Sequence, residues 1–236
     1  GSVLPDGGLF FYTNSSLDHN ALYGRLIRYE NNATNNRFVT ANDGVFFNRL
    51  LGNTGTYNEA VLIDGTLQSS NGSGNASLFS GSFSYPTQPG GFPTRFSVTP
   101  DPLYALPAGK VATTAMIVGT FKMAGTGFGG DTTTLKVFAD GAITGLTTSG
   151  CEVAGKLLGE LGSGLNLYRV EAFGYLKSPN GPITCELASG PPQSGSASAQ
   201  FDANGNVIGL RILAAGLSVA GTRARTVFVG AKQLTP

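Results

Sequence analysis

The chain has 236 residues, 35 of them glycine, and only 12% are charged, against roughly 25% in an average soluble protein. Its 15 Lys and Arg against 14 Asp and Glu leave a net charge of +1, which excludes recognition of nucleic acid or of an anionic membrane by bulk charge. Hydrophobic residues make up 41%, enough for a packed core, and no run of 18 apolar residues predicts a membrane-spanning helix.

The first hundred residues are typical of short strands separated by turn residues. Asn42-Asp43-Gly44 and Asp64-Gly65 predict turns, because these residues tolerate positive φ. For 15–23 there are two interpretations, a short helix capped by a serine or a loop that leads into the next strand, and we favour the loop. The strands predicted in this half are 8–13, 22–29, 37–51, 55–67, 78–85 and 95–99.

The segment 99–107 contains three prolines in nine positions. Proline fixes its own φ and biases the preceding residue toward extended geometry, so this segment is expected to be a stiff connector. We therefore predict two domains, 1–104 and 105–236.

The second half repeats the strand pattern more regularly. Asp140-Gly141 and Asn204-Gly205 each separate two β-rich runs, which is a strong indication of a hairpin. The predicted fold class is all-β and antiparallel, with two small β domains, the second an eight-stranded up-and-down barrel or a sandwich. The strands predicted in this half are 111–123, 132–138, 142–147, 151–158, 165–176, 195–202, 206–215 and 224–233.

The two cysteines, Cys151 and Cys185, lie 34 positions apart among small residues. With a single histidine in the chain they cannot complete a tetrahedral zinc site, and they lack the C-x-x-C spacing of a redox pair. We expect a structural disulfide, which would place the protein in an oxidising compartment. The alternative is two unrelated buried thiols.

Several motifs of the second half occur together. They are the segments 135–145, which contains Asp140-Gly141, 149–155, which begins Ser149-Gly150-Cys151, then Cys185, and 223–230, which begins at Arg223, with 104–107 and 117–121 similar as well. As a set they resemble a family of β-rich lipoproteins of Gram-negative bacteria whose function is unknown. A more distant similarity, at the level of fold, is to the barrels of surface lipoproteins that capture transferrin or haem.

That resemblance implies an exported protein of the periplasm, outer membrane or cell surface. Many members of the family are anchored by a lipid, which in this protein would be attached upstream of Gly1. The members of this family carry no motif associated with catalysis. Gly1-Ser2 is expected to be a cleavage scar.

Two sets of residues are candidates for binding. Arg223 and Arg225 share one face of the last strand, and Arg211 lies on the preceding one. Together they could hold an anion or an acidic partner, or simply cover a solvent-facing surface. The aromatic side chains of the first half could line a pocket or a carbohydrate-binding face, or pack a core. The tyrosines among the candidate binding residues are Tyr12, Tyr23, Tyr29 and Tyr57.

Residues that could support catalysis are sparse. His19 is the only imidazole and no G-x-S-x-G motif is present, so a Ser–His–Asp site is not expected. Glu171 could face a barrel interior with Arg169 on the same face, as a structural ion pair or as an acid/base group. The glycines of 125–130 contain G-x-G without the following lysine of a phosphate loop.

Three functions follow from these observations. The leading hypothesis is an exported non-catalytic binding module, a monomer that needs no cofactor, does not bind nucleic acid, has no transmembrane helix, and takes an unidentified ligand or protein partner. One alternative is a hydrolase that uses two carboxylates on envelope or extracellular glycans. The other is a purely structural component of the envelope.

Overall fold

The computed structural model of the chain is all-β. It describes residues 2–3, 8–12, 21–31, 35–40, 44–48, 57–69, 76–85, 93–99, 102–123, 132–159, 165–176, 192–217 and 223–233. The chain divides into two compact units, Gly1–Asp101 and Pro102–Pro236. The segment 15–23, for which we weighed a short helix and favoured a loop, lies partly outside the described residues, and the part that is described, from Ala21, is strand.

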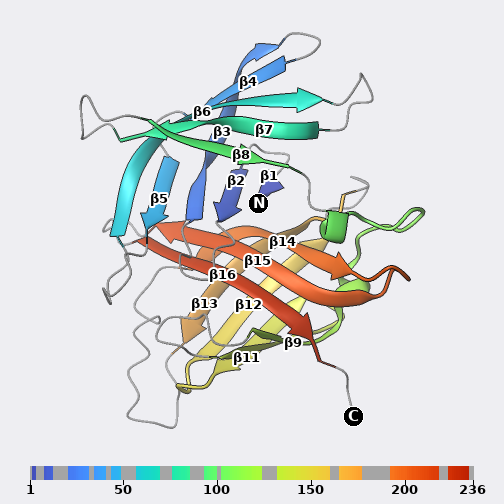
Figure 1. Cartoon of the computed structure of the whole chain (residues 1–236). Helices are drawn as coiled ribbons and strands as arrows, with labels where there is room; N and C mark the ends of the chain where they lie inside the picture. Colours follow the sequence, from blue (N-terminus) through green and yellow to red (C-terminus); the bar gives the residue numbers. More distant parts are fainter. Residues whose placement is uncertain are drawn as a thin grey trace. The chain divides into compact units, whose positions relative to one another are not determined.

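Unit 1 is an eight-stranded antiparallel sheet (Figure 1). Its strands are β1 (Ser2–Val3), β2 (Gly8–Tyr12), β3 (Ala21–Asn31), β4 (Asn35–Thr40), β5 (Gly44–Asn48), β6 (Tyr57–Ser69), β7 (Ala76–Ser84) and β8 (Thr94–Val98). The order is β1-β2-β3-β4-β6-β7-β8, and β5 pairs with both β3 and β6. Strands β4 and β5 therefore both occupy the space between β3 and β6, where one strand over 37–51 was predicted.

The turn predicted at Asp64-Gly65 is wrong. Both residues lie inside β6, where Gly65 pairs with Phe38 on one side and with Gly81 on the other. A Cβ on Gly65 would come within 2.7 Å of the Phe79 ring, so the glycine here makes room for an aromatic side chain. At this position the neighbouring Phe79 ring, and not turn formation, accounts for the glycine.

The described core of unit 1 is small and rich in aromatics. Its buried members come from β3, β6 and β7 and are Leu22, Val61, Ile63, Phe79 and Phe83. The Phe79 and Phe96 rings lie 5.3 Å apart between β7 and β8, in the range of favourable ring pairs. Several of the first half's aromatics therefore pack against one another, as the core interpretation of these residues expected.

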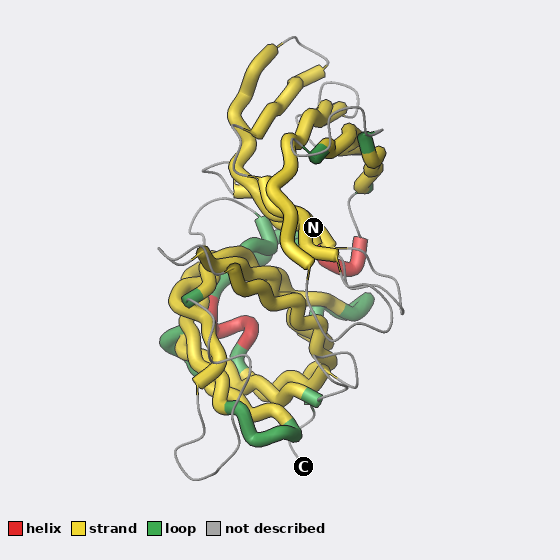
Figure 2. Tube along the Cα trace, turned by 90° about the vertical axis from the view of Figure 1, so that its left-hand side faces the viewer, coloured by secondary structure: helices red, strands yellow, loops and turns green. Residues whose placement is uncertain are grey.

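Unit 2 is a closed antiparallel barrel, which confirms the predicted up-and-down barrel over the sandwich. Its strands are β9 (Gly119–Met123), β10 (Thr133–Val137), β11 (Ala142–Thr147), β12 (Glu152–Gly159), β13 (Tyr168–Leu176), β14 (Gln193–Phe201), β15 (Val207–Leu217) and β16 (Arg223–Lys232). Each strand pairs with its neighbours in sequence, and β16 closes the ring onto β9. Figure 2 shows the strands as a ring.

Successive strands of the barrel run in opposite directions, so the connections between them lie alternately at one end of the barrel and at the other. We call the end that carries the connections 138–141, 160–167 and 202–206 the turn end. The other end carries 124–132, 148–151, 177–192 and 218–222, and we call it the loop end. The longest connection of the barrel, 177–192, is therefore at the loop end.

Two of the turn-end hairpins have the chemistry that their sequences predicted. Gly141 has φ +82°, and its N–H donates to the carbonyl of Phe138 at 2.9 Å. Gly205 has φ +76° and donates in the same way to Asp202 at 3.0 Å. Glycine adopts positive φ without the steric cost of a Cβ, which is why these positions can reverse the chain.

The strand predicted over 111–123 is only half right. Residues Thr114–Ile117 form a short 3₁₀ helix, η2, and the strand begins at Gly119. The helix starts where the Met116 N–H donates to the Thr113 carbonyl at 3.1 Å, and it buries Ile117 completely within the barrel core. β-branched residues favoured a strand locally, but the turn end of the barrel needs an apolar plug and η2 supplies one.

A bulge in β13 decides which of its residues face inward. Tyr168 and Val170 belong to the barrel core, the register shifts between Val170 and Phe173, and Phe173 is again fully buried in the core. The two residues of the bulge, Glu171 and Ala172, are both exposed. Ala172 has φ +48°, a conformation that is uncommon for a residue with a Cβ.

A pH-dependent stability is expected from Tyr168, whose hydroxyl donates to the Thr113 carbonyl at 3.2 Å. Burial raises the pKa of Tyr168 to about 12 from 10. Since the folded pKa is above the unfolded one, the stabilisation is complete below pH 10 and is lost as the pH rises through 12. We expect the urea-unfolding free energy to fall over this range, and to fall less steeply in Tyr168→Phe, which costs about 1 kcal/mol at neutral pH through the lost hydrogen bond. Equal slopes in the two proteins would contradict this assignment.

Candidate functional site

The interior of the barrel changes in character from one end to the other. Toward the turn end it is apolar and plugged by η2, with Ile117, Leu157 and Tyr168 fully buried. Toward the loop end polar side chains join apolar ones such as Met123 and Phe173 on the inner face, and the buried polar side chains there are Thr133, Thr147, Gln193 and Thr226. A buried polar group is costly unless it is hydrogen-bonded, so a concentration of such groups at one end needs an explanation.

Strand register places each of these residues on the inner face. Thr133 pairs with Met123 and Gln193 pairs with Phe173, and both partners belong to the barrel core. Thr226 pairs with Ala214, another core residue, and directly opposite side chains share one face of a sheet. We call Tyr175, Gln193 and Thr226 the loop-end cluster.

Gln193 is the member whose hydrogen bonding is incomplete. Its side chain is 3% exposed, and its carbonyl oxygen Oε1 has no hydrogen-bond partner among the described residues. An unpaired buried acceptor costs about 1–3 kcal/mol relative to a satisfied one. This oxygen is therefore a buried acceptor that lacks a donor among the described residues.

Tyr175 contributes an aromatic face and a hydroxyl. Its ring meets the Phe173 ring edge-on at a centroid distance of 6.0 Å. Burial raises the pKa of Tyr175, and a side-chain interaction with Thr226 lowers it by a smaller amount, so the phenol stays neutral at ordinary pH. Tyr175 and Thr226 lie on β13 and β16, three strands apart in the ring, so their contact runs across the interior.

The sequence argument did not identify this cluster. It placed Glu171 and Arg169 on the inner face of β13, but Glu171 is exposed and Arg169 half-buried on the outer face, because Tyr168 and Val170 are the inward residues of this part of the strand. The bulge at 171–172 then shifts the alternation. The same shift turns Phe173 and Tyr175 inward. For Gln193 a signal existed, since alternation from Ala197 and Ala199 places it on the apolar face of its strand.

Arg211 was a candidate anion ligand, and the structure places it against its own chain. It is 7% exposed, its Nη2 donates to the Ser198 hydroxyl at 2.8 Å, and its guanidinium carbon lies 4.0 Å from the centroid of the Tyr104 ring. Tyr104 is the last residue of the short helix η1 (Pro102–Tyr104). The backbone carbonyl of Tyr104 accepts a hydrogen bond from the Asn166 side chain at 2.8 Å. The cation thus holds the connector to the outer wall of β14 and β15.

The three arginines do not lie side by side. Arg211 pairs with Val229, whereas Arg225 pairs with Ala215 and Arg223 with Leu217. Four residues along a strand correspond to about 13 Å, so Arg211 and Arg225 are well separated. The side chains of Arg223 and Arg225 lie outside what the structure describes.

The candidate tyrosines of unit 1 can be placed only by backbone register. Tyr12 pairs with Ala21 and Tyr23 with Phe10, so these two tyrosines alternate onto the same face of β2 and β3. Tyr57 pairs with Asn48 on β5 and β6. Tyr29 lies at the register shift between β3 and β4. The side chains of all four lie outside the described residues, so their role in binding stays a prediction.

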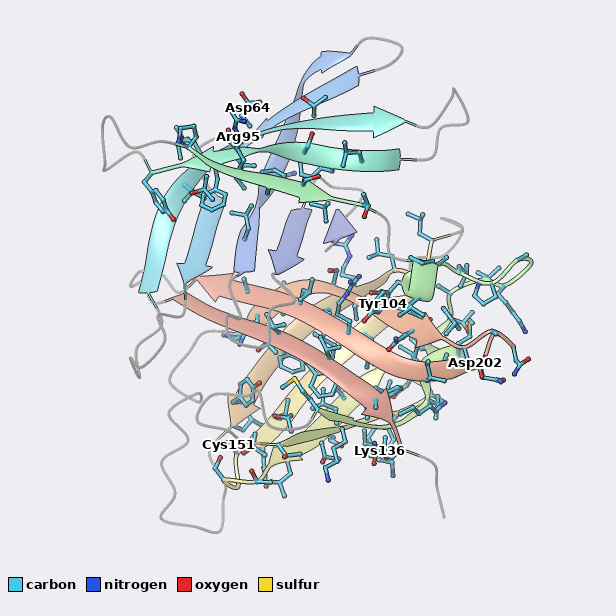
Figure 3. The ribbon with its side chains drawn as sticks, in the orientation of Figure 1. Asp64, Arg95, Tyr104, Lys136, Cys151 and Asp202 are labelled. Atoms are coloured by element: carbon cyan, nitrogen blue, oxygen red, sulfur yellow. The ribbon has the colours of Figure 1, made fainter. Side chains whose placement is uncertain are left out.

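Cys151 lies at the loop end, 4% exposed, and is disulfide-bonded. Its N–H donates to the Thr147 hydroxyl at 2.9 Å, which fixes the β11–β12 turn. In Figure 3, Cys151 and Asp202 lie at opposite ends of the barrel. Cys185 falls outside the described residues, in the connection 177–192.

Within the described ranges, acidic and metal-ligating side chains do not gather. Arg211 is the one charged residue among the buried side chains described. No group of three or more His, Cys, Asp or Glu side chains that could hold a metal ion occurs in this part of the chain. His19 and the glycines of 125–130 lie outside it.

Comparison with known proteins adds no family. Neither the models of protein families nor the curated proteins contain a match to this chain. None of the helices in the described part of the chain is long and apolar enough to cross a membrane.

Proposed function

We propose that this protein is an exported, non-catalytic binding protein of a bacterial cell envelope or surface, with the loop end of unit 2 as its binding face. The observation that carries the proposal is the difference between the two ends of the barrel. The turn end is plugged by η2 and apolar inside, whereas the loop end combines the longest connection with buried polar side chains. Binding residues commonly lie on loops positioned by a rigid scaffold, and the mouth of a β-barrel is a frequent ligand site.

The cysteine chemistry supports export. The chain has two cysteines, and Cys151 is disulfide-bonded. Glu152 pairs with Leu176, so Cys151 lies beside the start of the connection that contains Cys185. A Cys151–Cys185 bond would tie this connection to the barrel rim, and such bonds persist in oxidising compartments. Alkylation followed by mass measurement should show protected thiols until a reductant is added, whereas free thiols in the native protein would count against export.

The lipoprotein resemblance supports the same proposal. Asp140-Gly141, Ser149-Gly150-Cys151 and the 223–228 segment, which carried the resemblance, lie in the barrel or its turns. They include a hairpin turn, a rim cysteine and the strand that closes the ring. These residues fit a shared scaffold rather than a shared reaction, which agrees with a binding role.

Screening against arrays of glycans, haem compounds and host proteins tests the binding role. We expect reproducible binding to one of these classes, weakened at least tenfold by Leu176→Lys and unchanged by Ile208→Lys. Ile208→Lys is the matched control for Leu176→Lys, because both residues are exposed aliphatics of the outer wall at opposite ends of the barrel. Leu176 is 50% exposed and Ile208 is 40% exposed. Silence across all three classes would remove the binding proposal, and equal weakening by both variants would remove the assignment to the loop end.

A further inference from the structure

We infer that the loop-end cluster binds an uncharged small molecule that combines a hydrogen-bond donor with a flat apolar ring. This inference rests on the proposed function and names the chemistry of its site. It starts from the Gln193 oxygen, which is buried, faces the barrel interior and has no partner among the described residues. A ligand N–H or O–H is the complement of that acceptor.

The surroundings of Gln193 select an uncharged ligand. The described inward-facing side chains at this end are neutral, including Thr133, Thr147, Thr226 and the neutral phenol of Tyr175. The one buried charge described, Arg211, is on the outer wall with Ser198 and Tyr104. A charged ligand would lose its hydration here without gaining a counter-charge.

The neighbours of Gln193 also select an aromatic shape. Phe173 lies directly opposite Gln193 on the adjacent strand, and the Tyr175 ring packs edge-on against it. Phe173 is fully buried whereas Tyr175 is only partly buried, so a planar guest can pack against the Tyr175 ring in an edge-on or offset arrangement.

Indole is a direct probe of this site, because it is uncharged, planar and carries one N–H. The chain contains no Trp, so indole fluorescence excited where tyrosine does not absorb reports the probe alone. We expect saturable binding of indole to the full chain, and binding of 1-methylindole at least tenfold weaker, because the methyl group removes the donor. This comparison needs no variant protein.

Gln193→Met tests the acceptor, since methionine has a similar length and no hydrogen-bonding oxygen of that kind. We expect it to weaken indole binding at least tenfold and to leave the melting temperature unchanged or raised, because an unpaired buried oxygen is removed. The matched control is Gln200→Met, on the same strand but at an outward, half-buried position, which should bind indole as the parent does.

Three results would overturn the inference. One is no indole binding to the parent chain. The second is equal binding of indole and 1-methylindole, and the third is a lower melting temperature of Gln193→Met with indole binding unchanged. A partner found in the array screen together with any of these would leave the proposed binding function standing and remove only this ligand class. If the array screen finds no partner and one of these three results also occurs, the proposed binding function is removed as well.

Discussion

Gly141→Ala should lower the unfolding free energy by about 3 kcal/mol or more, an effect large enough to threaten folding of the barrel. Two costs combine at this position. The backbone has φ +82°, where a Cβ is strained, and the added Cβ would collide with the carbonyl oxygen of Leu157. That carbonyl cannot move freely, because the Leu157 N–H donates to the Gly141 carbonyl at 2.7 Å.

Two glycines with the same backbone conformation serve as controls. Gly205 has φ +76° and its nearest contact for a new Cβ is Pro107 at 3.5 Å, while Gly109 has φ +75° with nothing within 4 Å. Alanine at either position should cost only about 1 kcal/mol, from the dihedral angle alone. Chemical denaturation of the three variants measures the difference. Similar losses at all three positions would show that the Leu157 contact adds nothing.

Phe173→Ala should destabilise unit 2 by about 3–5 kcal/mol, the usual range for removing a fully buried phenylalanine. Phe173 is 0% exposed, packs against Tyr175, and its ring lies 3.0 Å from the position of a Cβ on Gly155. The variant should also weaken any ligand bound at the loop-end cluster, because Tyr175 loses its packing partner.

Phe138→Ala provides the comparison on the same type of side chain. Phe138 is 37% exposed at the turn end, with the Lys136 ammonium 5.0 Å from its ring centroid. Loss of this exposed contact should cost less than about 1 kcal/mol. Thermal unfolding of both variants separates burial from surface contacts, and equal shifts in melting temperature would refute the assignment of Phe173 to the core.

Local sequence signals were sufficient for the barrel. The Asp140-Gly141 and Asn204-Gly205 hairpins and the second-half strands appear in the structure with boundaries shifted by at most three residues, except for the strand predicted from 111, which begins at Gly119. These features depend on neighbours in sequence, namely turn chemistry and the two-residue period of a strand. The same local signals misled at Asp64-Gly65, where Phe79 from the next strand determines the use of the glycine.

Most of the candidate site could not be predicted from the sequence. Its inward aromatic residues depend on the bulge at Glu171 and Ala172, which no local motif announces. Its incomplete hydrogen bonding is a property of the folded interior, visible only when Gln193 is surrounded by its neighbours. Arg211 was singled out for its charge, but Tyr104, more than a hundred positions earlier, gives it a role in holding the connector.

The closure of the ring has a consequence for the order of events during synthesis. Lys122 on β9 pairs with Ala231 on β16, and the Gln233 N–H donates to the Thr120 carbonyl at 2.8 Å. The first strand of the barrel, β9, therefore gains its second partner only after β16 has been made. Until then the growing sheet has two open edges that can pair with another chain. A nascent chain of this kind is safest when it stays extended or chaperone-bound until its final residues are made.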